Sequence, residues 1–107
     1  MQAIPLGRIN VPTAGTPVAL TLSAAQLALL PPSQQVNRVE VWPDTQATGR
    51  VLVKCQGVTL AVLPVPTGGY PVPWSTPDSD RNSIAYAQFS LDAVTNGDGA
   101  YVTLWVA

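Results

Sequence analysis

The chain has 107 residues, of which five are basic and six acidic, and it contains one cysteine and no histidine. This length fits a single domain over residues 1–107, and a lone cysteine excludes an internal disulfide. The lack of histidine excludes catalytic triads and metal sites that depend on an imidazole.

The charge content is low. Charged residues make up 10% of the chain and hydrophobic residues 47%, whereas an ordinary soluble domain is about 25% charged. With a net charge of −1, a free monomer has little electrostatic repulsion to keep copies apart. A monomer with a surface of neutral polar residues is one explanation, and a surface covered by neighbouring subunits is the one we favour. The basic residues are scattered, so no nucleic-acid partner is expected.

The N-terminus is apolar although it precedes the first predicted strand. Residues 1–7 are therefore predicted to form an extended arm. Its apolar residues Ile4, Pro5 and Leu6 are expected to dock either on their own domain or on a neighbour, and we favour a neighbour. Neither a secretory signal nor a membrane-spanning run is present in the pattern, so no signal peptide and no membrane partner are expected.

Eleven prolines and eight glycines punctuate the chain and argue against long helices. Between them lie short runs rich in Val, Leu, Thr and aromatic residues. Such spacing is typical of an all-β sandwich or barrel of about eight short antiparallel strands. The predicted strands are Arg8–Val11, Pro17–Leu22, Val36–Trp42, Arg50–Cys55, Val58–Leu63, Tyr70–Trp74, Ile84–Leu91 and Tyr101–Val106.

One segment has a helical pattern. Residues 23–30 are rich in Ala and Leu, and Ser23 with Gln26 matches a capping box. The pair Pro31-Pro32 ends the pattern. A short helix is predicted there.

Alternation along the strands predicts which side chains face the core. The residues on the inward phase are Val39, Val41, Val51, Val53 and Cys55, and those on the outward phase are Arg38, Glu40, Trp42, Arg50 and Lys54. The run Val58–Leu63 is apolar on both faces. This suits either a central strand or a strand covered by another subunit.

Two turns have clear signals. Gln56-Gly57 predicts a tight reversal, because its glycine tolerates a positive φ. Asn96-Gly97-Asp98-Gly99 predicts a hairpin between Ser90–Val94 and Tyr101–Val106. With Asp92, this loop also has a weak likeness to a calcium loop, but it lacks the alternating acids and the terminal glutamate of that motif. Turn chemistry is the preferred explanation.

No set of residues points to catalysis, so the chain is predicted not to be an enzyme and to need no cofactor or metal. Six acidic residues remain as possible carboxylate pairs, but they are interpreted as solvated charges and turn formers. Cys55 is predicted to be a packing thiol, since Lys54 points to the opposite face of its strand.

Trp42, Trp74 and Trp105 are candidate interface residues, together with the three apolar residues of the arm. Exposed tryptophans act as platforms for sugar rings or as anchors between subunits, and buried ones close the ends of a core. Trp42 and Trp105 lie on the outward phase of their strands, which favours an interface. Trp74 lies between Pro73 and Ser75 and cannot be assigned to a face.

Several stretches of the chain together form a wider pattern. It opens with Val11-Pro12-Thr13-Ala14-Gly15-Thr16-Pro17-Val18-Ala19-Leu20. It continues through Val39–Trp42, a polar loop and Thr48-Gly49-Arg50-Val51-Leu52-Val53, and it ends with Ser90-Leu91-Asp92-Ala93 and Asn96-Gly97-Asp98-Gly99 before Tyr101-Val102. This pattern resembles the small virion structural proteins of tailed bacteriophages. The resemblance covers most of the chain.

The resemblance implies a single jelly-roll-like β-sandwich that serves as a capsid decoration (cement) protein, binding and stabilising the assembled phage head. It further implies that the partners are the major capsid protein and copies of the chain itself, as a homotrimer. The location would be the virion, assembled in the host cytoplasm. The alternatives are a tail, neck or fibre component and a carbohydrate-binding β-sandwich module.

Overall fold

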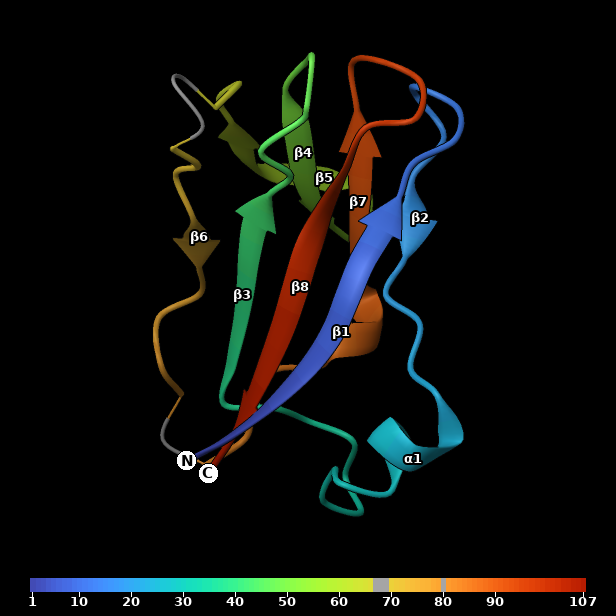
Figure 1. Cartoon of the computed structure of the whole chain (residues 1–107). Coiled ribbons are helices and arrows are strands. Elements are labelled where there is room, and N and C mark those ends of the chain that lie inside the picture. The colour runs from blue at the N-terminus through green and yellow to red at the C-terminus, as the bar shows by residue number, and fades with distance from the viewer. Residues whose placement is uncertain (67–69, 80) are drawn as a thin grey trace.

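A computed structural model describes residues 1–66, 70–79 and 81–107 (Figure 1). It confirms the all-β prediction, because the described residues form eight strands in two four-stranded antiparallel sheets. The strands are β1 (Gln2–Asn10), β2 (Val18–Ala19), β3 (Arg38–Pro43), β4 (Val51–Cys55), β5 (Val58–Leu63), β6 (Trp74–Ser75), β7 (Phe89–Ala93) and β8 (Gly99–Val106). Two short helical elements, α1 (Ala24–Leu27) and the 3₁₀ turn η1 (Tyr86–Gln88), lie between strands.

The strand order is that of a jelly roll. The front sheet, nearest the viewer in Figure 1, has the order β1-β8-β3-β6, and the back sheet has the order β2-β7-β4-β5. The first strand therefore pairs with the last, the second with the seventh, the third with the sixth and the fourth with the fifth. The pairings of β3 with β8 and β4 with β7 complete the two sheets. Both termini consequently lie side by side at one end of the sandwich (Figure 1).

The core lies between the two sheets and follows the predicted alternation. Val39 and Val41 on β3, and Val51 and Val53 on β4, are almost completely buried. Cys55, at the end of β4, is partly buried and packs against this core. Alternation therefore identified the inward face of both strands correctly.

The reversal at Gln56-Gly57 is confirmed as a two-residue hairpin turn. It joins β4 to β5, and Cys55 pairs directly with Val58 across it. Both turn residues have positive φ, +52° at Gln56 and +80° at Gly57. Two left-handed residues in succession define the turn whose twist matches that of the flanking strands.

The hairpin predicted at residues 96–99 is wrong. The strands on its two sides belong to different sheets, β7 to the back sheet and β8 to the front sheet. The loop therefore crosses from one sheet to the other. Gly97 still has the positive φ of +84° that the turn signal suggested. The local signal for a turn was sound, but β8 pairs with β1 and β3, and its residues Val102, Leu104 and Val106 face the core between the two sheets.

The N-terminal arm is also corrected, because residues 2–7 belong to β1. This strand begins six residues before the predicted start at Arg8 and pairs along its whole length with β8. Pro5 is tolerated because β1 lies at the edge of its sheet. The register shifts between Pro5 and Gly7, so Leu6 is the extra residue of a bulge. The segment docks on its own domain and not, as we favoured, on a neighbour.

The capping box predicted for the short helix is present. The Ser23 Oγ accepts a hydrogen bond from the Gln26 backbone N–H (3.2 Å), and Gln26 Oε1 accepts one from the Ser23 N–H (2.8 Å). The helix α1 is only four residues long and ends at Leu27, earlier than predicted. Gln26 Nε2 also donates to the Pro5 carbonyl (2.8 Å), which ties α1 to β1.

The hairpin at Gln56-Gly57 supports a test of the turn. Replacing Gly57 with Ala is expected to lower the free energy of unfolding by about 1–2 kcal/mol, since a Cβ is disfavoured at this left-handed φ. Replacing Gln56 with Asn should leave stability equal or slightly higher, because Asn tolerates positive φ. Urea unfolding measures both. An unchanged midpoint for Gly57→Ala would contradict the turn geometry.

Candidate interaction surfaces

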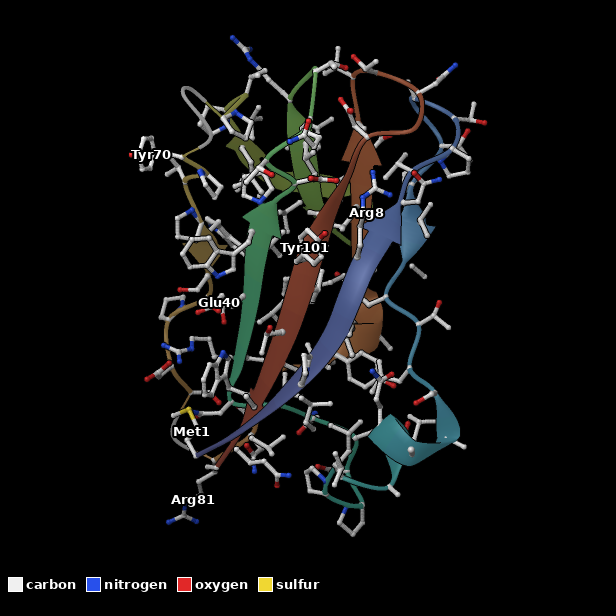
Figure 2. The ribbon with its side chains drawn as sticks, viewed as in Figure 1. Met1, Arg8, Glu40, Tyr70, Arg81 and Tyr101 are labelled. Carbon is white, nitrogen blue, oxygen red and sulfur yellow. The ribbon has the colours of Figure 1, made fainter. Side chains whose placement is uncertain are left out.

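The outer face of the front sheet carries three of the chain's aromatic side chains. They lie on β3 and β8, which pair residue by residue: Arg38 opposite Trp105, Glu40 opposite Thr103, and Trp42 opposite Tyr101. Figure 2 shows Glu40 and Tyr101 on this face, with Arg8 of β1 beside Tyr101. The outward phase predicted for Trp42 and Trp105 is therefore the one observed. We call this surface the front face.

Trp42 and Tyr101 form a half-exposed aromatic pair on the two middle strands of the front sheet, next to the last pair of the β3–β8 ladder. Their exposed fractions are 40% and 47%. The indole Nε1 of Trp42 donates a hydrogen bond to Glu40 Oε1 (3.0 Å), which holds the ring in one orientation. A fixed aromatic surface loses little conformational entropy when a partner covers it, so this pair is suited to act as an anchor.

Trp105 also lies on the front face but is covered by Arg38. The guanidinium carbon of Arg38 lies 4.9 Å from the centre of the indole ring, within cation–π range. The Arg38 Nε in turn lies 3.5 Å from the Asp78 carboxylate. Within the described part of the chain the buried Trp105 Nε1 has no hydrogen-bond partner. Trp105 is thus a less accessible interface candidate than Trp42.

Trp74 faces the other way. It lies opposite Val41 in the pairing of β6 with β3, and Val41 is a core residue. Its side chain is partly buried and packs against the core. The position that the sequence could not assign to a face is therefore an inward one, and Trp74 closes the core instead of presenting a ring to a partner.

The three apolar residues predicted as an interface at the N-terminus separate in the structure. Ile4 is fully buried in the core opposite Leu104, and Leu6 is partly buried against the same core. Pro5 alone is exposed, opposite Thr103. Ile4 and Leu6 are therefore core residues, which corrects their assignment as interface candidates.

The second candidate surface lies on β5, for which the sequence left two interpretations open, a central strand and a strand covered by another subunit. The strand β5 is an edge strand, so the option of a central strand for Val58–Leu63 is wrong. Val58, Leu60 and Val62 are 63%, 49% and 49% exposed. Among the residues that the structure describes, twelve large hydrophobic ones are exposed, and six of these lie in residues 58–66 and 70–72. We call the strand Val58–Leu63 with its exposed apolar side chains the β5 edge.

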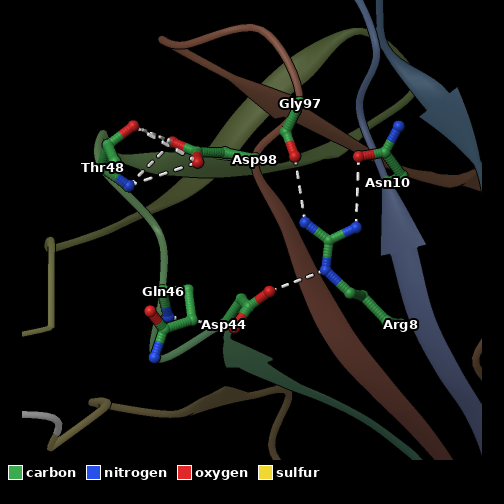
Figure 3. Close-up of polar contacts among 7 residues, drawn as sticks. All are labelled: Arg8, Asn10, Asp44, Gln46, Thr48, Gly97 and Asp98. Atoms are coloured by element: carbon green, nitrogen blue, oxygen red, sulfur yellow. Dashed lines mark hydrogen bonds and ion pairs between the residues drawn. The ribbon is translucent and has the colours of Figure 1, made fainter.

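A polar network ties together the loops at the end of the sandwich opposite the termini (Figure 3). The Arg8 guanidinium donates to Asp44 Oδ2 (2.7 Å), Asn10 Oδ1 (3.1 Å) and the Gly97 carbonyl (2.9 Å). Arg8 thus connects β1 to the loops that follow β3 and β7.

Asp98 also connects two loops, by accepting hydrogen bonds from backbone N–H groups. Its carboxylate accepts hydrogen bonds from the N–H groups of Thr48 (3.2 Å) and Gly49 (2.8 Å). These contacts tie the turn at residues 96–99 to the loop after β3, as turn chemistry predicts.

Asp92 is a buried carboxylate with a full set of partners. Its Oδ1 accepts from the N–H groups of Gly15 (2.9 Å) and Ala93 (2.8 Å), and its Oδ2 lies 3.2 Å from Lys54 Nζ. Burial by itself would raise the pKa of Asp92, but the hydrogen bonds from Ala93, Lys54 and Gly15 together lower it.

Asp44, in the network around Arg8, also has a lowered pKa. The largest cause is the hydrogen bond from the Gln46 backbone N–H (3.0 Å), followed by the one from Arg8. Both carboxylates are therefore ionised in the folded protein to a lower pH than in the unfolded chain.

Residues 1–66, 70–79 and 81–107 contain no group of three His, Cys, Asp or Glu side chains placed to hold a metal ion. No pocket is present in the described part of the chain. In the same part, no helix is long and apolar enough to span a membrane. The candidate sites are thus the two open surfaces, the front face and the β5 edge.

Comparison of the chain with protein-family models, with curated proteins and with solved structures found no match. The class of the protein therefore rests on its own strand order, which is that of a jelly-roll β-sandwich.

The lowered pKa values of Asp44 and Asp92 predict loss of stability in acid. Below the ordinary value of about 3.8 the unfolded chain takes up protons before the folded protein does, so stability falls as the pH drops. At pH 7, Asp92→Asn should lower the free energy of unfolding by about 1–3 kcal/mol, because it removes a buried charge-assisted contact with Lys54. The variant should also depend less on pH below 4. Chemical denaturation across pH measures both.

The matched control is Asp78→Asn. Asp78 is also paired with a basic residue, Arg38, but its side chain is 53% exposed. Its substitution should change stability by less than about 0.5 kcal/mol. Equal losses in the two variants would show that the burial of Asp92 has no special energetic role.

Proposed function

We propose that this protein is a structural component of a bacteriophage virion, a capsid decoration protein that binds the assembled head. The observation that carries the proposal is the half-exposed aromatic pair of Trp42 and Tyr101 on the outer face of the front sheet, in a chain with only 10% charged residues. Large apolar surfaces on small proteins mark sites of contact with other macromolecules. The jelly-roll fold and the sequence resemblance to phage virion proteins agree with this role.

The front face is the surface we assign to the capsid. Tyr, Trp and Arg are the residue types that carry most of the binding energy in protein interfaces. On this face Trp42 and Tyr101 are half exposed, and Arg8 lies beside Tyr101. Because all three lie on strands of one sheet, the fold holds them in fixed positions before any partner binds.

Decoration would act by mass action on the assembled shell. A protein that binds only the assembled state stabilises that state, by about 2.7 kcal/mol per site at a concentration a hundred times the dissociation constant. Many equivalent sites on one shell multiply this effect. The chain itself needs no catalytic group for such a role.

Binding to heads tests the proposal. The protein is expected to bind heads of its phage that were assembled without it, and Trp42→Ala should weaken binding about tenfold or more, since the exposed indole is one of the two aromatic anchors of the front face. Co-sedimentation of protein with purified heads measures the affinity. Tyr70→Ala is the matched control, because Tyr70 is an exposed aromatic residue outside the strands of the front sheet. Failure of the wild-type protein to bind the heads would refute the decoration role, and cryo-EM of the particle would reveal a tail, neck or fibre position.

One observation favours a second candidate function, a carbohydrate-binding module. The aromatic pair of Trp42 and Tyr101 lies next to the polar pair of Glu40 and Thr103. Sugar rings stack on aromatic faces while their hydroxyl groups hydrogen-bond to neighbouring polar side chains. Such a site can form on an open sheet without a pocket.

A glycan array separates the two candidates. If the second function is correct, the protein binds a defined glycan, and Trp42→Ala and Tyr101→Ala each abolish the signal while both variants remain folded. A signal that survives both substitutions, or no signal from the wild type, would remove the carbohydrate function.

A further inference from the structure

The two sheets leave four edge strands, β1 and β6 in the front sheet and β2 and β5 in the back sheet. An edge strand presents unpaired backbone N–H and C=O groups on which another strand can add. Proteins that must stay monomeric protect such edges with short strands, prolines, bulges or charges. An edge strand that lacks this protection is therefore a candidate site for pairing with a strand of another chain.

Three of the four edges are protected. The strands β2 and β6 are each two residues long and follow Pro17 and Pro73. The strand β1 is longer, but it contains Pro5, a bulge at Leu6 and the charged Arg8. The short lengths, the prolines and the charge oppose a regular ladder with a second strand. The bulge does not distinguish β1 from β5, because β5 has one at Leu60.

The strand β5 is different. It is six residues long, and its sequence VTLAVL has no charge and no proline. Its three apolar side chains Val58, Leu60 and Val62 are about half exposed or more. The one irregularity is a register shift that leaves Leu60 without a partner on β4, while Ala61, Val62 and Leu63 pair regularly. This is the one edge among the described strands that is both long and uncharged.

We propose that the β5 edge pairs with the β5 edge of a second copy, antiparallel and related by a two-fold axis. A ring of copies needs two different open edges on each chain, one to donate and one to accept. Here the other three edges are protected, whereas a two-fold pairing needs only one open edge. The strand also suits itself, because it carries no charged residue that pairing with a second copy would leave buried and unpaired. The back sheets of the two copies thereby join into one eight-stranded sheet.

The size of the contact sets its strength. A strand of six residues spans about 20 Å. Edge-to-edge contact over that length, with side chains on both faces, covers roughly 400 Å² per copy, about half of a standard interface. A contact of this size is smaller than that of a permanent dimer, so the dimer is expected to dissociate on dilution. It is a different assembly from the homotrimer that the sequence resemblance implies.

Sedimentation equilibrium of the purified full chain tests the pairing. The wild type is expected to shift from monomer to dimer as its concentration rises. Val62→Lys should weaken the dimer about tenfold or more, because a lysine on an edge strand opposes pairing. The matched control is Val94→Lys, which alters an equally apolar residue that is 62% exposed in the loop after β7. It should leave the dimer unchanged.

Hydrogen exchange supplies a second readout that needs no variant. Protection of the backbone amides of residues 58–63 should increase with protein concentration, while that of the amides in β1 should not. A wild type that stays monomeric, a trimer, a dimer that survives Val62→Lys, or unchanged protection of residues 58–63 would each overturn the proposal. The pairing concerns the free chain, so its failure leaves binding to heads unaffected, and failure to bind heads leaves the pairing intact.

Discussion

The antiparallel pairing of β1 with β8 is the interaction on which the rest of the structure depends. It runs from Gln2 opposite Val106 to Asn10 opposite Gly99 and brings the two ends of the chain together. Because β8 also pairs with β3, this contact places three strands in one sheet. The strands between them in sequence then pair as β2 with β7 and β4 with β5 in the other sheet. Ile4 and Leu104, opposite each other and fully buried, seal the core at this point.

The same pairing creates the front face. Tyr101 of β8 lies between Arg8 of β1 and Trp42 of β3, three residues that are far apart in sequence and adjacent only through sheet register. The β5 edge, by contrast, belongs to the back sheet and results from a local hairpin. Since the two surfaces lie on different sheets, our two proposals do not compete: one chain can contact a shell and a second copy at the same time.

Sequence reasoning performed well where structure is local. Alternation identified the buried faces of β3 and β4, the Ser23–Gln26 capping box formed as expected, and Gln56-Gly57 formed the predicted turn. Each of these depends on residues within a few positions of one another, or on the two-residue period that a half-buried strand imposes.

The errors arose where pairing partners are distant. Pro5 concealed the start of β1, because a proline in a strand is acceptable only at an edge, and edge position follows from the strand order. The turn at residues 96–99 was read as a hairpin, since no local feature shows that β7 and β8 join different sheets. For the same reason the sequence left Trp74 unassigned and left β5 open between a central and a covered strand.

The amino-acid sequence alone therefore determined the all-β class, the absence of imidazole chemistry, the inward and outward phases of the longer strands, and the low charge that points to covered surfaces. Only the tertiary structure decided that Ile4 and Trp74 serve the core, that Trp42 and Tyr101 form one aromatic pair, and that β5 is an open edge. The physical reason is that alternation along a strand is a property of neighbouring residues. Sheet order, in contrast, is settled by which distant strands bury the most apolar surface together.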